Sequence, residues 1–261
     1  MHRRRSARKL LRFKDPASGL LEAQLSSSFF RKVLFAAMLG CLNCAATAQT
    51  KASLDVNETL FSVVAGINVC GYDAELQSSL PIRAEVRNDL VAASESPQVA
   101  AAANDLCHFY REHQQGDSTH DLAQYVSLAL YLGEPPEFTP KVKEADMPPD
   151  AAYVLGYVPL IKQYYAAAKL HQIWLKHQRE YLGLIDRYHD AIAGMISSTD
   201  TYLRMPISGY LGRTFTIYLE PMTAPGQPNS RNYMQDYYYV VVSPTGDNIR
   251  LEELRHTYLH F

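Results

Sequence analysis

The sequence of 261 residues lacks the short motifs that mark the commonest nucleotide-binding and hydrolase folds. It has no phosphate-binding loop, no dinucleotide-binding glycine fingerprint and no G-x-S-x-G nucleophile motif. Such motifs set phosphates against a helix N-terminus, or a serine on a strained turn, for a specific chemistry. The sequence therefore gives no support to those nucleotide-dependent or serine-hydrolase activities.

Cysteine is scarce, with four residues in the whole chain. Cys41 and Cys44 lie in the N-terminal segment, whereas Cys70 and Cys107 lie in the body. Neither Cys70 nor Cys107 belongs to a C-x-x-C unit, so a redox or zinc-knuckle role has no support. In an oxidising compartment these two could form a disulfide, and two separate buried thiols are the alternative.

Acidic residues are rare at the N-terminus and prevail in the rest of the chain. Residues 1–48 contain nine Lys or Arg and two Asp or Glu, which leaves 16 basic and 25 acidic residues beyond them. An acidic body is repelled by phosphate backbones, so we expect no nucleic-acid partner.

The longest apolar run of the basic N-terminal segment covers residues 33–42, which is too short to span a bilayer. It follows Arg31 and Lys32 and precedes the sequence Ala-Thr-Ala at 46–48. This succession predicts a signal peptide that is cleaved after Ala48 and a secreted or periplasmic protein without a transmembrane helix. A buried N-terminal helix is the alternative. Residues 1–30 are either an extended basic leader or lie before the true start.

Apolar spacing predicts a mainly helical chain that ends with a small sheet. We expect helices over 54–69, 81–90, 99–113, 121–132 and 170–195. The segment 134–150 contains five prolines and is predicted to be a connection. Alternating or β-branched residues over 213–220 and 237–242 predict two antiparallel strands, joined by a polar loop over 221–234.

These elements predict an α+β fold, mainly α, with four parts. The parts are a leader at 1–48, a helical region at 49–133, the connection at 134–150, and a region at 151–261 that holds the long helix, a β-hairpin and a final helix. His177 falls in the apolar stripe of the long helix, where a lone histidine is more often a hydrogen-bonded core residue than a ligand.

The final helix, expected from residue 251 onward, carries the candidate metal site on roughly the opposite side from its apolar face. The residues expected on the apolar face are Leu251, Leu254, Tyr258 and Phe261. His256 and His260 are four residues apart, which sets two imidazoles on one helix face. Glu252 lies one turn earlier on that stripe and is a possible further ligand or orienting carboxylate. Zinc is the candidate cofactor, and a surface helix with a Glu–His contact and no metal is the alternative.

The residues His256-Thr257-Tyr258-Leu259-His260, preceded by the predicted strands, resemble the active-site helix of gluzincin-type zinc metallopeptidases. The segments at 54–61 and 204–213 also resemble secreted bacterial proteins of this kind that carry no assigned chemistry. The resemblance implies the front half of a zincin-like domain, with a short sheet before the helix and an edge strand along the substrate cleft. It also implies that His256 and His260 are the two zinc histidines.

The same resemblance places Thr257 where the family has the glutamate that activates water. Threonine cannot replace a carboxylate as a general base near neutral pH. The family's third ligand is a glutamate on a later helix, which we would expect after Phe261. The resemblance thus implies a secreted zincin-like protein that is catalytically inactive and whose partner is a peptide or protein. The alternative is a non-catalytic helical binding or scaffold module of the bacterial cell envelope.

Overall fold

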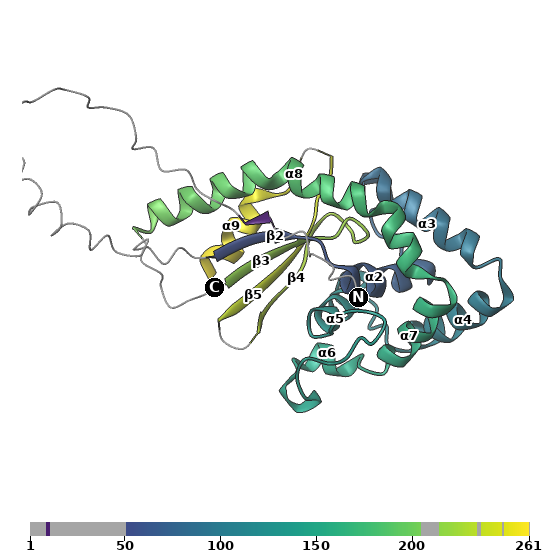
Figure 1. The fold of residues 1–261 in the computed structure, drawn as a ribbon. Helices are drawn as coiled ribbons and strands as arrows, with labels where there is room; N and C mark the ends of the chain where they lie inside the picture. Colours follow the sequence, from purple (N-terminus) through teal and green to yellow (C-terminus); the bar gives the residue numbers. More distant parts are fainter. Residues whose placement is uncertain (1–8, 11–50, 205–213, 234–235, 247, 261) are drawn as a thin grey trace, which may run out of the picture.

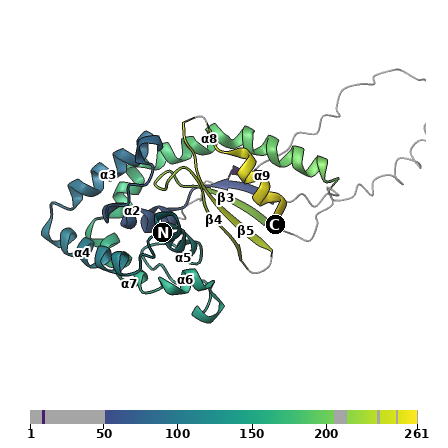
Figure 2. The same ribbon diagram turned by 180° about the vertical axis from the view of Figure 1, so that it is seen from behind.

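The computed structural model describes residues 9–10, 51–204, 214–233, 236–246 and 248–260. Its fold is α+β and mainly α, as predicted, with a helical part at one end and a small sheet at the other (Figures 1 and 2). One long helix, α8 (Leu170–Tyr202), runs from the helical part along the sheet and so connects the two.

The sheet is mixed, and the predicted antiparallel pairing of its two sequence-evident strands is wrong. The strands are β1 (Lys9–Leu10), β2 (Lys51–Asp55), β3 (Thr214–Leu219), β4 (Gly226–Tyr233) and β5 (Tyr237–Ser243), in the spatial order β1-β2-β3-β5-β4. β3 pairs in parallel with both β2 and β5, while β4 pairs antiparallel with β5. The expected hairpin of β3 and β5 is therefore replaced by a parallel pair, with β4 at the edge.

The edge strand β4 occupies the segment that was predicted to be a polar loop. Its sequence is Gly-Gln-Pro-Asn-Ser-Arg-Asn-Tyr, and the register of its pairing with β5 shifts between Gly226 and Asn229. Pro228 lies within this shift. Proline removes a ladder donor, so it is tolerated at edges and irregularities, where a polar strand can form without a run of apolar residues.

The predicted helix over 54–69 is a strand followed by a helix. Leu54 and Asp55 belong to β2, and α2 (Glu58–Val69) begins after Asn57, whose Oδ1 accepts a hydrogen bond from the Leu60 N–H at 2.9 Å. An asparagine at this position satisfies one of the helix's unpaired amide donors and fixes its start. Ten of the twelve residues of α2 are buried, so α2 is the centre of the helical part.

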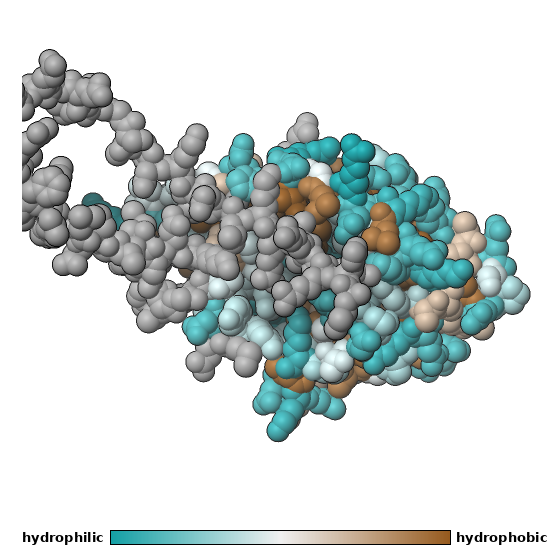
Figure 3. Space-filling view, viewed as in Figure 1, coloured by the Kyte–Doolittle hydropathy of each residue, from teal (hydrophilic) through white to brown (hydrophobic). Residues whose placement is uncertain are grey.

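Other helices surround α2. They are α3 (Pro81–Ala93), α4 (Pro97–Glu112), α5 (Ser118–Leu130), α6 (Pro149–Tyr153) and α7 (Tyr157–Ala167), with 3₁₀ turns at Leu76–Ser78 and Glu144–Asp146. The first three of these helices were predicted, and α6 and α7 were not. The face of this part that Figure 3 shows is mainly hydrophilic with small separate apolar patches, because the apolar helix faces turn inward.

Cys70 and Cys107 form a disulfide, which resolves the alternative that the sequence left open. Cys70 ends α2 and Cys107 lies in α4, 37 residues further along the chain. The bond therefore ties the central helix to a neighbouring one.

The long helix α8 confirms the strongest periodic pattern of the sequence. Near its start, Trp174 and Tyr181 pack on Phe61 of α2, with ring centroids 5.1 Å and 5.7 Å from the Phe61 ring. Further along, α8 contacts β2, β3 and the final helix, α9 (Leu251–His260). Among the described residues, no helix is long and apolar enough to cross a membrane.

Candidate functional site

The final helix α9 is fixed on its apolar side. Leu254 is buried, and Tyr258 packs edge-on against Phe215 of β3 with ring centroids 5.0 Å apart. The Tyr258 hydroxyl also donates to Asp200 Oδ1 of α8 at 2.9 Å. Burial raises the pKa of Asp200, although this hydrogen bond acts in the opposite direction. The predicted apolar face is thus confirmed for Leu254 and Tyr258, while Phe261 lies outside the described residues.

The predicted metal stripe lies on the exposed side of α9. Glu252, His256 and His260 are all exposed, and the two imidazole rings are stacked with their centroids 6.4 Å apart. The Glu252 carboxylate is bound by Arg255 Nη1 at 3.0 Å through both of its oxygens. Glu252 therefore pairs with Arg255, one turn further along α9.

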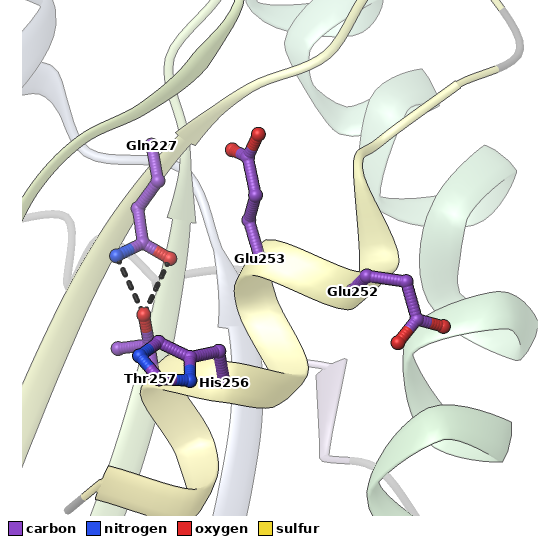
Figure 4. Close-up of a pocket in the computed structure, with 5 residues that line it drawn as sticks. All are labelled: Gln227, Glu252, Glu253, His256 and Thr257. Atoms are coloured by element: carbon purple, nitrogen blue, oxygen red, sulfur yellow. Dashed lines mark hydrogen bonds between the residues drawn. The ribbon is translucent and has the colours of Figure 1, made fainter.

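Thr257, which stands in the place of the family's glutamate, contacts the edge strand directly. Gln227 Nε2 of β4 donates to Thr257 Oγ1 at 2.7 Å, and Thr257 Oγ1 lies 3.0 Å from Gln227 Oε1, as the dashed lines in Figure 4 show. Beside this contact is an open hollow of about 500 Å³. It is lined by Gln227, Glu252, Glu253, His256 and Thr257.

The side chains around the hollow point in different directions. In Figure 4, Gln227 and Thr257 point toward each other across the gap between β4 and α9, whereas Glu252 points away from Gln227. Glu253 pairs with Arg250 at 3.1 Å. The lining of the hollow thus consists of two glutamates that each pair with an arginine, one imidazole and an amide–hydroxyl pair.

The described residues do not complete a zinc site around His256 and His260. A catalytic zinc ion generally takes three protein ligands and a water. Within the described ranges, no third His, Cys, Asp or Glu forms a compact group with these two histidines. Two imidazoles alone do not meet that requirement.

A compact group of three metal-ligating side chains does occur elsewhere, between α3 and α8. It consists of Glu85 on α3 with His177 and Glu180 on α8, and one ligand atom of each lies within 4.8 Å of the others. This group could hold a metal ion. His177 is buried and its Nε2 lies 2.8 Å from Asp89 Oδ2, so the prediction of a hydrogen-bonded core histidine is confirmed.

A third group of functional side chains is enclosed where the sheet meets the helical part. The Glu220 carboxylate accepts hydrogen bonds from the Tyr181 hydroxyl and the Met222 N–H, both at 2.9 Å. Its second oxygen has no partner among the described residues. Burial raises the pKa of Glu220 to about 7, although both hydrogen bonds and the charge of buried Arg83 lower it.

Sequence reasoning identified the candidate site on α9 but not the groups around His177 and Glu220. His177 and Glu180 are three residues apart on a recognisable helix, but Glu85 and Asp89 come from another helix far along the chain. Glu220 is the last residue of the predicted strand over 213–220, and nothing in the alternating pattern shows that its carboxylate is buried. No protein-family model, no curated protein and no solved structure matches this chain.

Proposed function

We propose that the protein is an exported, zincin-related protein without peptidase activity, which binds a peptide or protein partner in the hollow between β4 and α9. The contact between Gln227 and Thr257 carries this proposal. It joins the edge strand of the sheet to the helix with the two histidines, at the position where a zinc peptidase would have its general base.

The position of β4 supports a binding role for the hollow. β4 is the last strand in the spatial order of the sheet, so among the described residues it has a strand neighbour on one side only. The resemblance to gluzincins implies an edge strand beside the substrate cleft, and Gln227 of β4 lines the hollow together with residues of α9. Edge strands can bind extended peptides through unpaired backbone groups and nearby side-chain pockets.

The absence of activity follows from Thr257. A threonine hydroxyl does not accept a proton from water near neutral pH, and loss of a general base typically lowers a rate by about 10²–10⁴-fold. The hydroxyl is also engaged by the Gln227 amide, which holds it toward the edge strand. Thr257 therefore acts as a structural contact between helix and sheet.

Export rests on a leader that lies almost wholly outside the described residues. Lys9 and Leu10 alone are described in it, as strand β1 beside β2. The disulfide between Cys70 and Cys107 supports export, because structural disulfides are typical of oxidising compartments and rare in the cytosol.

The test combines a cleavage assay with peptide selection. In an assay with a fluorogenic peptide library, we expect no metal-dependent cleavage. Such cleavage would be inhibited by a chelator and abolished by His256→Ala. Peptides selected from a displayed random library on the unmodified chain should lose binding to Thr257→Trp, which fills the hollow. They should keep binding to Leu259→Trp, which adds the same ring at an exposed position that does not line the hollow. Chelator-sensitive cleavage, or equal binding to both tryptophan variants, would overturn the proposal.

A scaffold module of the cell envelope is the second candidate. It is favoured by the exposure of His256 and His260 and by the engagement of Glu252 with Arg255. In this case the histidine pair has no ligand, and the hollow selects no peptide. Substituting both histidines by alanine would then change neither metal content nor peptide binding.

A further inference from the structure

The group between α3 and α8 has the composition and the arrangement of a metal site. His177 is 2% exposed, whereas Glu85 and Glu180 are exposed to solvent. Asp89, one turn after Glu85 on α3, lies against the far nitrogen of the same imidazole. Two helices thus contribute three carboxylates to one buried histidine.

Asp89 determines which nitrogen of His177 carries the proton. Its Oδ2 lies 2.8 Å from His177 Nε2, and both of its oxygens accept from Lys176 Nζ at 2.7 Å. Asp89 is therefore an acceptor, and this hydrogen bond assigns the proton of a neutral imidazole to Nε2.

The other nitrogen then has a lone pair that faces a carboxylate. His177 Nδ1 lies 3.3 Å from Glu180 Oε1. Glu85 belongs to the same compact group, in which one ligand atom of each residue lies within 4.8 Å of the others. A lone pair and a carboxylate oxygen are both acceptors, so they repel at this distance unless a cation lies between them. That cation is either a second proton on the imidazole or a metal ion.

The separation of His177 Nδ1 and Glu180 Oε1 matches a shared metal ion. Zinc binds imidazole nitrogen and carboxylate oxygen at about 2.0–2.2 Å, so two ligands at a tetrahedral angle are about 3.4 Å apart. The separation of 3.3 Å between His177 Nδ1 and Glu180 Oε1 agrees with this value. A long hydrogen bond from an imidazolium would have the same length, and the experiment below separates the two.

We propose that His177 Nδ1 and the carboxylates of Glu85 and Glu180 bind a divalent transition-metal ion of the zinc class. Asp89 is a positioning residue that holds the Nε2–H and keeps Nδ1 free to ligate, as carboxylates do behind metal-bound histidines. One imidazole and two carboxylates suit zinc better than magnesium or calcium, which prefer oxygen ligands alone. Water completes the coordination, because both glutamates face solvent.

This site is independent of the histidine pair on α9 and of the proposed function. Bound metal would link α3 to α8, the helix that connects the helical part with the sheet. It would therefore stabilise the packing of α3 on α8, because a ligand that binds only the folded state raises its stability.

The test uses zinc alone, with calorimetric titration and thermal melting of the full chain. The background variant His256→Ala/His260→Ala removes the α9 pair, and we expect it to bind zinc and to melt at a higher temperature with zinc than without. Adding Glu85→Gln/Glu180→Gln should raise the Kd for zinc at least about tenfold, because both carboxylate ligands are lost. Adding Glu134→Gln/Glu137→Gln, two exposed glutamates in the connection, makes the same change of charge and should leave the Kd unaltered.

Asp89→Asn provides a readout specific to positioning. We expect this substitution to raise the Kd for zinc by about 10–100-fold, because loss of a hydrogen bond behind a ligating histidine lowers metal affinity by this amount. Since Glu85 and Glu180 are exposed, their substitution leaves the core intact. Absence of zinc binding in the background variant, or binding that Glu85→Gln/Glu180→Gln does not weaken, would overturn the proposal. In the first case His177 would be an imidazolium between Asp89 and Glu180.

Discussion

Gln227 of the edge strand β4 and Thr257 of helix α9 meet through both ends of the Gln227 amide, with contacts of 2.7 Å and 3.0 Å to one hydroxyl. This pair connects the sheet to the helix on the polar side of α9. On the apolar side, Tyr258 makes the corresponding connections to Phe215 and Asp200. Adjacent residues of α9 therefore attach it to the edge strand on one side and to β3 and α8 on the other.

The energetic coupling of Gln227 and Thr257 is the first prediction. We expect Gln227→Ala and Thr257→Val to be coupled by about 0.5–1.5 kcal/mol in a double-mutant cycle, the usual net value of a side-chain hydrogen bond. Urea unfolding of the four proteins measures this coupling. Gln227→Ala combined with Leu259→Ala serves as the control pair, because Leu259 does not line the hollow. Independent effects of the first pair would mean that the contact does not stabilise the fold.

The second prediction concerns the disulfide between Cys70 and Cys107. Replacing both residues by alanine should destabilise the protein by about 2–4 kcal/mol, because the bond closes a long loop in the unfolded chain and limits its entropy. The sequence separation of 37 residues places the expected loss toward the upper end of that range. Denaturant unfolding of the oxidised protein, the reduced protein and the alanine variant measures the loss. Equal stability of all three would show that the bond is absent in solution.

Sequence reasoning succeeded where the pattern of apolar residues lies within a single helix. The long helix α8 was predicted because its apolar residues recur every three or four positions, a pattern that burial of one helix face imposes. The apolar face of α9 was predicted for the same reason, and Leu254 and Tyr258 lie on it. No contact with another part of the chain was needed for either inference.

The prediction of strand pairing was wrong because pairing depends on partners that are distant in sequence. The patterns of β3 and β5 are real, but their short separation favoured a hairpin, whereas the chain forms β4 between them and returns in parallel. The last two residues of β2, Leu54 and Asp55, were assigned to a helix because they adjoin the apolar stripe of α2. Burial against β3, which lies far along the chain, determines its conformation instead.

The candidate sites show the same difference between patterns within one element and contacts between distant elements. His256 and His260 were found from their spacing on one helix, and the structure places them together on its exposed side. Glu85, Asp89 and His177 become a group only when α3 packs on α8, so no local pattern identifies them. The zinc prediction for the α9 pair remains a prediction.

Export yields the third prediction. Cleavage after Ala48 would leave Gln49 as the first residue of the mature protein, two positions before β2 begins. It would also remove β1, whose two residues pair with Leu54 and Ser53, and make β2 an edge strand. We expect β2 to remain in place, because its other edge pairs along its whole length with β3. N-terminal sequencing of exported protein measures the cleavage position, and a mature chain that retains Arg31 would contradict it.

The last prediction follows from the buried carboxyl group of Glu220. Its pKa is raised to about 7 by burial, whereas an unfolded glutamate titrates at about 4.3. Between these values the folded protein holds a proton that the unfolded chain lacks, so stability falls as pH rises through about 7. The full contribution is present below about pH 4, and the loss above about pH 8 is on the order of 4 kcal/mol.

Glu220→Gln isolates this effect from the other titrating groups. The glutamine carbonyl can still accept from Tyr181 and from the Met222 N–H, but the side chain cannot ionise. Urea unfolding at about pH 5 and about pH 8 should therefore show a steeper loss of stability in the unmodified protein than in Glu220→Gln. Glu137→Gln, at an exposed position, should behave like the unmodified protein. The same pH dependence in the Glu220→Gln variant would show that Glu220 is ionised throughout, with a cation or water at its second oxygen, because an ionised buried carboxylate requires a compensating partner.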